Sequence, residues 1–356
     1  MKRSQVLNAL KLVIGAVDDK QGVVQGSDSF VFSDDFVNTY NNKCSFSYPL
    51  ETGISCTVKA RETLAIIEKM KGDNITFELK KDYLQVSDGS TKLKMKLIKD
   101  DEDIRTIISD LNLDDLEWKK LPKDFADGVD LCAWTVCRDK RLENIQSMLF
   151  TSNEIWSSDN YRISRFELDD AIPDEFTLPS ESVFILQKLS SPPEEYATEG
   201  NWVHFKSSNG IVFSSNLAYE KFPVEEFSET VESYSDEECE MYEFPEGIEK
   251  AIDVASILAF EDKEVEVPSI SISRKGKKLI VEGKKACGSV SDEITFSGKM
   301  FDEGLVITVP PGFLKTILGV TREFAIFDKK IIQFKTDNFV QLVTSFGDDG
   351  EDVDES

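Results

Sequence analysis

Histidine and paired cysteines are scarce in this chain. The sequence has one histidine, His204, among 356 residues, and it has no C-x-x-C pair. One imidazole leaves no second histidine for the usual zinc sites and none to activate a serine or cysteine in a catalytic triad. Because His204 lies in an alternating segment, we interpret it as a strand residue. The six scattered cysteines are typical of reduced thiols in a cytoplasm rather than of a zinc ribbon or disulfide scaffold.

Long apolar runs and enzyme motifs are also absent. No run of 18 apolar residues occurs, and Asn8 and Lys11 interrupt the N-terminal segment where a signal peptide would be continuously apolar. The sequence contains no P-loop, no glycine-rich dinucleotide motif, no H-E-x-x-H and no G-x-S-x-G. Acidic pairs such as Asp114-Asp115 lack calcium-loop spacing and are interpreted as solvated surface. These absences predict a cytoplasmic protein that is not an enzyme and uses no metal or cofactor.

Positive charge is the minority charge. Lys and Arg number 41 against 67 Asp and Glu, which gives a net charge of -26. This balance argues against a simple basic nucleic-acid-binding module. It leaves room for a local basic surface within an acidic whole.

What the sequence does contain is an internal repeat. Three segments run from a strand end into an amphipathic helix, beginning at Thr57, Thr177 and Thr308, which are 120 and 131 residues apart. Pro179 and Pro310 fall where a helix begins, the position at which a missing N–H costs least. A repeat of this size indicates three copies of one structural unit.

A second helix opens each copy and supplies an independent landmark. Apolar residues recur with helical spacing over 4–17, 122–137 and 245–260. Each of these helices is followed by an acidic-basic step, Asp19-Lys20, Asp139-Lys140 and Asp262-Lys263, at offsets of 120 and 123 residues. Both landmarks therefore indicate a period near 120, with a short insertion in the third copy.

Alternating segments between the helices predict strands, and a hairpin follows each second helix. The three predicted hairpins pair 75–79 with 83–86, 202–205 with 211–213, and 324–327 with 331–334. Two helices among about eight strands must lie on one face of antiparallel sheets. The prediction is an α+β protein of three tandem repeats, with domains at 1–118, 119–241 and 242–346 and an acidic tail at 347–356. The acid-rich stretch from Glu225 to Tyr242 is interpreted as a solvated linker.

The repeats resemble a known family, the bacterial DNA polymerase III β subunit or β sliding clamp. The segment 156–163 (WSSDNYRI) is similar to the family's second-domain strand and T-D-G-H-R-L turn, and 215–223 (SNLAYEKFP) is similar to its S-x-L-x-x-G-x-F-P segment. The chain departs from the family in three places. Its first helix begins almost at Ser4 without a preceding strand, its turn reads D-N-Y-R-I, and an acidic tail replaces the short hydrophobic C-terminus. A divergent, phage-encoded member would explain these departures.

The resemblance implies a head-to-tail homodimer whose six domains close a ring around duplex DNA, with the helices lining the hole. DNA held by enclosure needs only a few contacts to phosphates, without base readout. Basic residues on the helices and in the loops after them are the expected DNA contacts, although Asp127, Asp130 and Asp253 lie on the same helices. The expected DNA-binding residues are Lys11, Lys20, Arg61, Lys69, Arg138, Lys140, Arg141, Lys188, Lys263, Lys315 and Arg322.

The resemblance also implies contacts with proteins. DNA polymerase and clamp loader would insert short peptides into a groove between domains two and three. Carried over by position, its walls are Tyr161, Arg162, Ile163, Phe222, Pro223, Leu342, Val343 and Phe346, although Leu342 and Val343 could equally be interdomain core. The expected subunit interface joins Lys69, Ile75, Ile104 and Ile108 of one copy to Ile257, Leu258 and Phe260 of the other. The alternative is a non-catalytic scaffold built from the same repeats, with no DNA in the ring.

Overall fold

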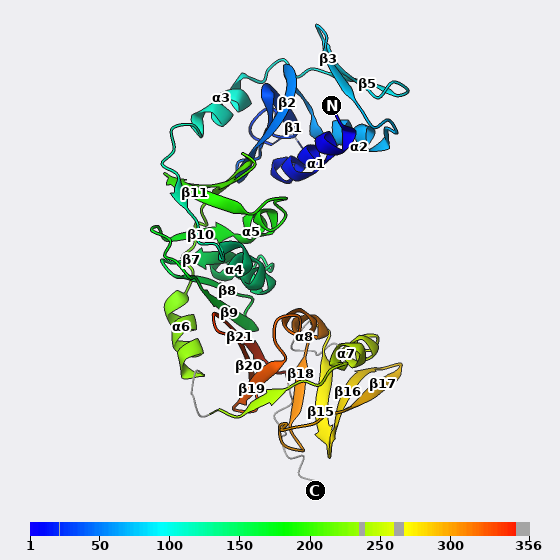
Figure 1. Ribbon diagram of the computed structural model, residues 1–356, viewed down its shortest axis with the longest axis vertical. Coiled ribbons are helices and arrows are strands. Elements are labelled where there is room, and N and C mark those ends of the chain that lie inside the picture. The colour runs from blue at the N-terminus through cyan, green and yellow to red at the C-terminus, as the bar shows by residue number, and fades with distance from the viewer. Residues whose placement is uncertain (21, 235–238, 260–266, 347–356) are drawn as a thin grey trace. The chain divides into compact units, whose positions relative to one another are not determined.

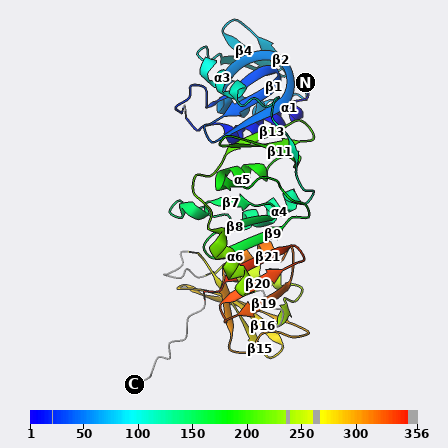
Figure 2. The same ribbon diagram turned by 90° about the vertical axis from the view of Figure 1, so that its left-hand side faces the viewer.

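The computed structural model describes residues 1–20, 22–234, 239–259 and 267–346 (Figures 1 and 2). The chain divides into two compact units. The first unit comprises Met1–Asp130, Leu149–Asn153 and Asp169–Lys221, and the second comprises Leu131–Met148, Glu154–Leu168 and Phe222–Ser356. The three expected domain boundaries remain predictions, and the acidic tail lies outside the described residues.

The six helices expected from the repeats are all present. Those that open the copies are α1 (Arg3–Val13), α4 (Phe125–Cys132) and α7 (Ile248–Ser256), and those that follow the strands are α2 (Ala60–Lys69), α5 (Ser180–Leu186) and α8 (Pro311–Ile317). Short 3-10 turns extend α1 through Ile14–Ala16 and α4 through Ala133–Thr135. The apolar stripe of α1 is buried as its spacing predicts, at Val6, Ala9, Leu10 and Val13.

The first unit is built on a six-stranded antiparallel sheet in the order β1-β2-β13-β12-β11-β6. Its strands are β1 (Ser29–Tyr40), β2 (Cys44–Lys59), β6 (Lys119–Lys120), β11 (Pro193–Glu199), β12 (Trp202–Ser207) and β13 (Val212–Asn216). Phe46 on β2 packs against Phe213 on β13 with ring centroids 5.0 Å apart. The side chain of His204 is buried on β12, with its Nδ1 2.8 Å from Ser214 Oγ, so the interpretation as a strand histidine is confirmed.

A smaller sheet in the first unit has the order β3-β4-β5, from β3 (Thr76–Leu79), β4 (Tyr83–Ser87) and β5 (Lys92–Lys96). The expected absence of a strand before the first helix needs correction. Lys2 forms an isolated bridge with Asn74, and Met1 and Ile75 exchange two hydrogen bonds. The N-terminus therefore pairs with the chain as a strand would, although it is too short to count as one.

The second unit contains a run of six antiparallel strands in the order β8-β9-β21-β20-β19-β14 and a separate sheet in the order β17-β16-β15-β18. The strands of the first are β8 (Glu154–Ser158), β9 (Arg162–Glu167), β14 (Met241–Glu243), β19 (Glu323–Phe327), β20 (Ile331–Lys335) and β21 (Phe339–Thr344). Those of the second are β15 (Ile270–Lys275), β16 (Lys278–Lys285), β17 (Gly288–Thr295) and β18 (Val306–Val309). The remaining strands β7 (Ser147–Phe150) and β10 (Phe176–Pro179) lie side by side.

The three expected hairpins form, as β3 with β4, β12 with β13 and β19 with β20. Two further helices were not expected, α3 (Glu102–Asp110) and α6 (Val224–Ser233). Because α6 occupies most of the acid-rich stretch and Met241 and Tyr242 belong to β14, the interpretation of that stretch as a linker or loop is wrong for 225–233 and 241–242. Val231 is buried on α6, while Glu225, Glu226 and Glu229 are exposed. Burial of an apolar side chain therefore stabilises a helix whose acidic composition is typical of a linker.

Candidate DNA- and peptide-binding surfaces

Four expected DNA contacts lie on or next to the helices of the first unit. Lys11 on α1 is exposed and pairs with Glu68 at 3.0 Å, and Arg61 on α2 pairs with Asp19. Lys69 at the end of α2 and Lys188 after α5 are exposed and make no ion pair among the described residues. Two of these four cations are therefore free to meet a phosphate without first breaking an ion pair.

The expected cations of the second unit are more often paired. Lys315 on α8 pairs with Asp253 on α7, and Arg322 pairs with Glu249 and donates to the Pro245 carbonyl at 2.9 Å. Acidic side chains of α7 thus neutralise both cations. In the sequence, Asp253 argued against a basic surface on this helix. In the structure its carboxylate pairs with Lys315, so the two charges offset each other.

The loops after the opening helices carry Lys20 in the first unit and Lys140 and Arg141 in the second, all exposed. Arg141 forms a forked ion pair with Asp139, with Nη2 2.6 Å from Oδ2 and Nε 3.0 Å from both carboxylate oxygens. These bonds lower the pKa of Asp139 to about 2. Lys20 and Lys140 make no ion pair in the described parts of the chain, Arg138 is exposed, and Lys263 lies outside them.

The turn from Asp159 to Arg162 is the most tightly organised part of the expected groove. The Asp159 carboxylate accepts hydrogen bonds from the backbone of Tyr161 and Arg162 at 3.2 and 2.8 Å. Asn160 has a φ of 75°, in the left-handed region that asparagine tolerates better than most residues. Asparagine therefore suits the left-handed backbone that this turn has at position 160.

Arg162 is fixed from several directions. Its guanidinium donates to Asp159 Oδ2 at 2.8 Å and to the Trp134 carbonyl, and it lies 3.7 Å from the ring centroid of Phe313. The side chain is only 8% exposed, and this burial lowers its pKa. Because its guanidinium is buried and held by these partners, the Arg162 side chain is fixed in place between β9 and α8.

Tyr161 and Phe346 form the more open part of this surface. Their rings meet edge to face, with centroids 5.2 Å apart, and both side chains are half-buried. Phe346 is held at the end of the described chain by its amide, which donates to the Thr308 carbonyl at 2.7 Å, while the Thr344 amide donates to Tyr161 at 2.9 Å. Ile163 and Pro223 are also half-buried.

Three residues expected in the groove wall are instead core residues. Phe222, Leu342 and Val343 are each at most 3% exposed. Phe222 packs on Phe227 of α6, and Leu342 pairs in register with Ile163 of β9. For Leu342 and Val343 the alternative interpretation as core applies, because both faces of this central strand are covered.

The expected subunit interface is also revised. Ile75 and Ile104 are fully buried within the first unit and offer no surface to a partner, while Ile108 is half-buried against the cluster around Ile104. In the second unit Ile257 is 72% exposed and Leu258 is half-buried, so both remain available. Phe260 lies outside the described residues.

A basic edge strand was missed. Lys92, Lys94 and Lys96 are exposed on β5, which pairs only with β4, while Leu93 between them is buried. None of the three lysines makes an ion pair in the part of the chain that the structure describes. The alternating K-L-K-M-K pattern is the signal that could have identified this strand as a charged edge.

Among the described residues, no group of three or more His, Cys, Asp or Glu side chains is placed to hold a metal ion. Among the same residues, no helix is both long and apolar enough to cross a membrane.

Comparison with known proteins places these surfaces in a common fold. No family model and no curated protein sequence matches the chain. Among solved structures, the chain is similar to the DNA polymerase III β subunit of Thermotoga maritima, at 14% identity over 98% of both chains with a TM-score of 0.73. It is similar to the β chain of Streptococcus pneumoniae, at 14% identity over 97% of this chain and 98% of that one, with a TM-score of 0.75.

A third similar structure is the Helicobacter pylori β clamp bound to a DNA ligase peptide, at 14% identity over 98% of this chain and 99% of that one, with a TM-score of 0.73. These likenesses span nearly the whole length of each chain. The expectation from the three repeats is thereby confirmed: this chain has the fold of the bacterial DNA polymerase III β subunit, the β sliding clamp.

Proposed function

We propose that this chain is a DNA sliding clamp, a processivity factor that encircles duplex DNA and tethers a replicative polymerase. The observation that carries the proposal is the match to clamp structures over 97–98% of this chain and 98–99% of theirs. The protein acts as a binding ring in the cytoplasm and catalyses no reaction.

The ring consists of two copies joined head to tail. The edge strand β5 carries Lys92, Lys94 and Lys96, and the edge strand β17 of the second unit carries Asp292 and Glu293, of which Glu293 already pairs with Lys278. Joining β5 of one copy to β17 of the other would cover both edges and bring opposite charges together. Exposed Ile257 adds apolar area to the same association.

DNA is held by enclosure and by a few phosphate contacts. Lys20, Lys69, Lys140 and Lys188 are the strongest candidates, since they are exposed and make no ion pair among the described residues. The paired cations Lys11, Arg61, Arg141, Lys315 and Arg322 contribute less, because an ion pair must open or be shared before a phosphate is bound. Weak, sequence-independent contacts allow the ring to slide.

The partner peptide of polymerase or loader binds beside Tyr161, Arg162 and Phe346. Tyr161 and Phe346 supply half-buried aromatic surface, and buried Arg162 keeps the turn in place. Ile163 and Pro223 extend this surface. Such a small apolar surface beside a rigid polar turn suits a short, partly apolar peptide.

The DNA contacts are tested by replacing Lys20 and Lys140 with glutamate in one variant. Binding to a short linear duplex should weaken, and the slope of log affinity against log salt should shrink by roughly one to two units. A matched variant, Lys123→Glu with Lys335→Glu, makes the same charge change at exposed lysines outside the expected contacts. Equal effects of the two variants would mean that net charge, rather than the helix-end loops, sets the affinity.

The non-catalytic scaffold remains the second candidate. It is favoured by one observation, that Lys11, Arg61, Lys315 and Arg322 are paired with carboxylates of the same molecule. A scaffold would assemble into the same ring but show no salt-dependent affinity for duplex DNA.

A further inference from the structure

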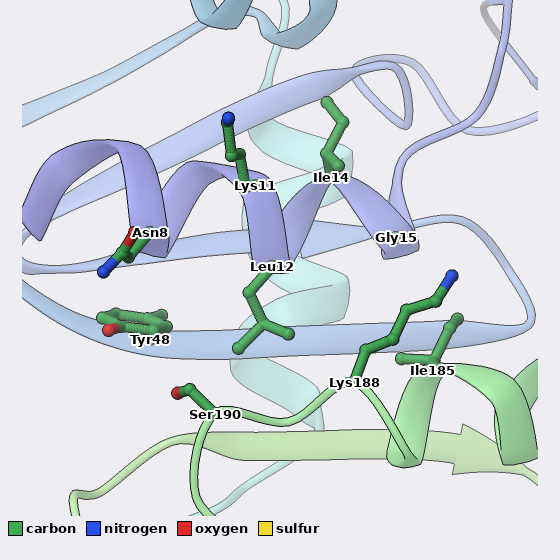
Figure 3. A pocket seen from close by; sticks show the side chains of 9 residues that line it. All are labelled: Asn8, Lys11, Leu12, Ile14, Gly15, Tyr48, Ile185, Lys188 and Ser190. Carbon is green, nitrogen blue, oxygen red and sulfur yellow. The ribbon is translucent and has the colours of Figure 1, made fainter. Parts of the chain in front are cut away.

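A pocket lies in the first unit where α1, β2 and the end of α5 meet (Figure 3). Its volume is about 500 Å³, within the usual range for small-molecule sites. The lining residues are Asn8, Lys11, Leu12, Ile14, Gly15, Tyr48, Ile185, Lys188 and Ser190. No carboxylate is among them, in a chain where acidic residues outnumber basic ones.

The backbone arrangement explains why this space stays open. Phe46 and Tyr48 point to the same face of β2, but Phe46 is buried while Tyr48 is only half-buried. Gly15 has no side chain at the point where Ile185 of α5 approaches, and a Cβ there would lie 3.6 Å from Ile185. The end of α1 therefore lies at ordinary contact distance from Ile185 of α5, and the gap remains beside Tyr48.

The pocket combines apolar surface with unused polar groups. Leu12 and Asn8 point from α1 toward Tyr48, while Lys11 points to the other side of the helix and pairs with Glu68 (Figure 3). The side chains of Asn8, Tyr48, Lys188 and Ser190 make no hydrogen bond or ion pair within the described residues. Ligand sites typically combine an apolar surface with a few polar groups that orient the ligand, and this pocket has four polar side chains without a partner beside an apolar surface.

These groups specify the chemistry of the ligand. A flat aromatic face and a leucine suit a planar ring, an amide and hydroxyls suit the polar edge of that ring, and a free lysine suits an anion. We propose that this pocket binds one nucleoside monophosphate unit, with its base against Tyr48 and Leu12 and its phosphate at Lys188. The unit comes either from a free nucleotide or from an unpaired nucleotide of single-stranded DNA.

A nucleotide site would add a second binding activity to the proposed clamp. Enclosure holds duplex DNA whose bases stay stacked, and it requires no pocket for a base. A nucleotide site would instead let the protein distinguish an unpaired nucleotide from duplex. The site could exist in a scaffold as well as in a clamp, so its test is independent of ring closure on DNA.

The test measures the affinity of the full chain for three probes: thymidine monophosphate, a fluorescent oligothymidylate and a blunt duplex of equal length. Lys188→Glu and Tyr48→Leu should each weaken binding of oligothymidylate by about tenfold, as expected when a charged contact or one base stack is lost. Tyr48→Leu should change duplex affinity less than about twofold. Lys123→Glu, which changes the same charge at an exposed lysine outside the pocket, should leave oligothymidylate binding unchanged.

Asn8→Trp serves as a second variant, since Asn8 is exposed and a large ring there would fill the pocket without disturbing the core. It should also weaken oligothymidylate binding, and thermal unfolding checks that each variant is folded. Competition by thymidine monophosphate would assign the site to free nucleotides as well, and its absence would assign it to single-stranded DNA. Failure of wild type to bind oligothymidylate, equal weakening by Lys188→Glu and Lys123→Glu, or unchanged binding in folded Tyr48→Leu and Asn8→Trp would overturn the proposal.

Discussion

At the scale of single residues, Phe346 is the side chain on which the peptide surface depends most. Its ring meets Tyr161 edge to face and is half-buried, so it has area left for a partner. Phe346→Ala should weaken a labelled clamp-binding peptide by about tenfold, or about 1.4 kcal/mol, without changing the native mass. Fluorescence titration measures this effect, with Phe36→Ala as the control because Phe36 is also exposed but lies in the first unit. Equal affinities of Phe346→Ala and wild type would place the peptide elsewhere.

His204 gives a prediction about acid stability. Burial lowers its pKa to about 4 from the ordinary 6.5, while the unfolded chain keeps the ordinary value. Below pH 6.5 the unfolded state therefore binds more protons at this residue, and the free energy of unfolding falls as pH drops from 6.5 toward 4. The difference of about 2.5 units corresponds to about 3 kcal/mol at most.

Chemical denaturation of wild type and His204→Gln at several pH values measures this loss. The variant should have lower stability at pH 7, because a buried ring and its bond to Ser214 are lost, but a shallower decline between pH 6.5 and 4. Parallel declines in the two proteins would show that His204 does not titrate in the assigned range.

Some site residues could be identified from the sequence and others could not. Arg162 and Tyr161 were assigned to the groove because the turn resembles a family pattern, and hydrogen bonds to Asp159 organise that turn in the structure; their role in peptide binding stays a prediction. Leu342 and Val343 were placed in a groove because alternation along a strand cannot tell whether one or both faces are covered. Lys188 and Tyr48 share a pocket because the end of α5 lies beside α1 and β2, a tertiary arrangement that no local sequence pattern predicts.

At the scale of elements, the repeat period predicted all six helices that it covered, because buried stripes such as Val6, Leu10 and Val13 recur in every copy. The two helices it missed lie outside the repeat landmarks and are rich in acidic residues. In α3, Ile107 and Ile108 pack against the cluster around buried Ile104, and in α6 Phe227 packs on Phe222 while Val231 is buried. Tertiary contacts of a few apolar residues made these segments helical although the acidic residues around them resemble a solvated loop.

The packing of α7 on β16 gives a prediction at this scale. A Cβ on Gly283 would lie 2.0 Å from the Ala255 carbonyl oxygen, which belongs to helix backbone and cannot rotate away. Gly283→Ala should therefore lower the free energy of unfolding by about 3 kcal/mol. Gly312→Ala is the matched control, since a Cβ there meets nothing within 4 Å and α8 should gain about 0.5–1 kcal/mol. Urea denaturation compares the two, and a small effect of Gly283→Ala would mean that α7 shifts easily on its sheet.

At the scale of the whole molecule, the three repeats and the segments 156–163 and 215–223 resemble the clamp family, and similarity to solved clamps confirms the fold that this resemblance implies. The subunit contacts were harder to predict, because Ile75 and Ile104 are apolar residues of the inner core and the sequence does not mark which apolar residues stay exposed.

The charged edge strand β5 is a better candidate for the subunit interface than Ile75 and Ile104. Replacing Lys92, Lys94 and Lys96 with glutamate should separate the copies and reduce a native mass of about twice 40.1 kDa to that of one chain.

Retention on circular DNA tests the central claim most directly. The protein is mixed with nicked circular plasmid, and its two copies are cross-linked to each other but not to the DNA. The complex is washed in high salt. Bound protein is then measured before and after a single cut linearises the plasmid. A closed ring should remain on the circle and leave the linear DNA through its ends, whereas the Lys92, Lys94 and Lys96 triple glutamate variant should remain on neither. Loss of the wild-type protein from the uncut circle, or equal retention before and after cutting, would contradict encirclement of DNA.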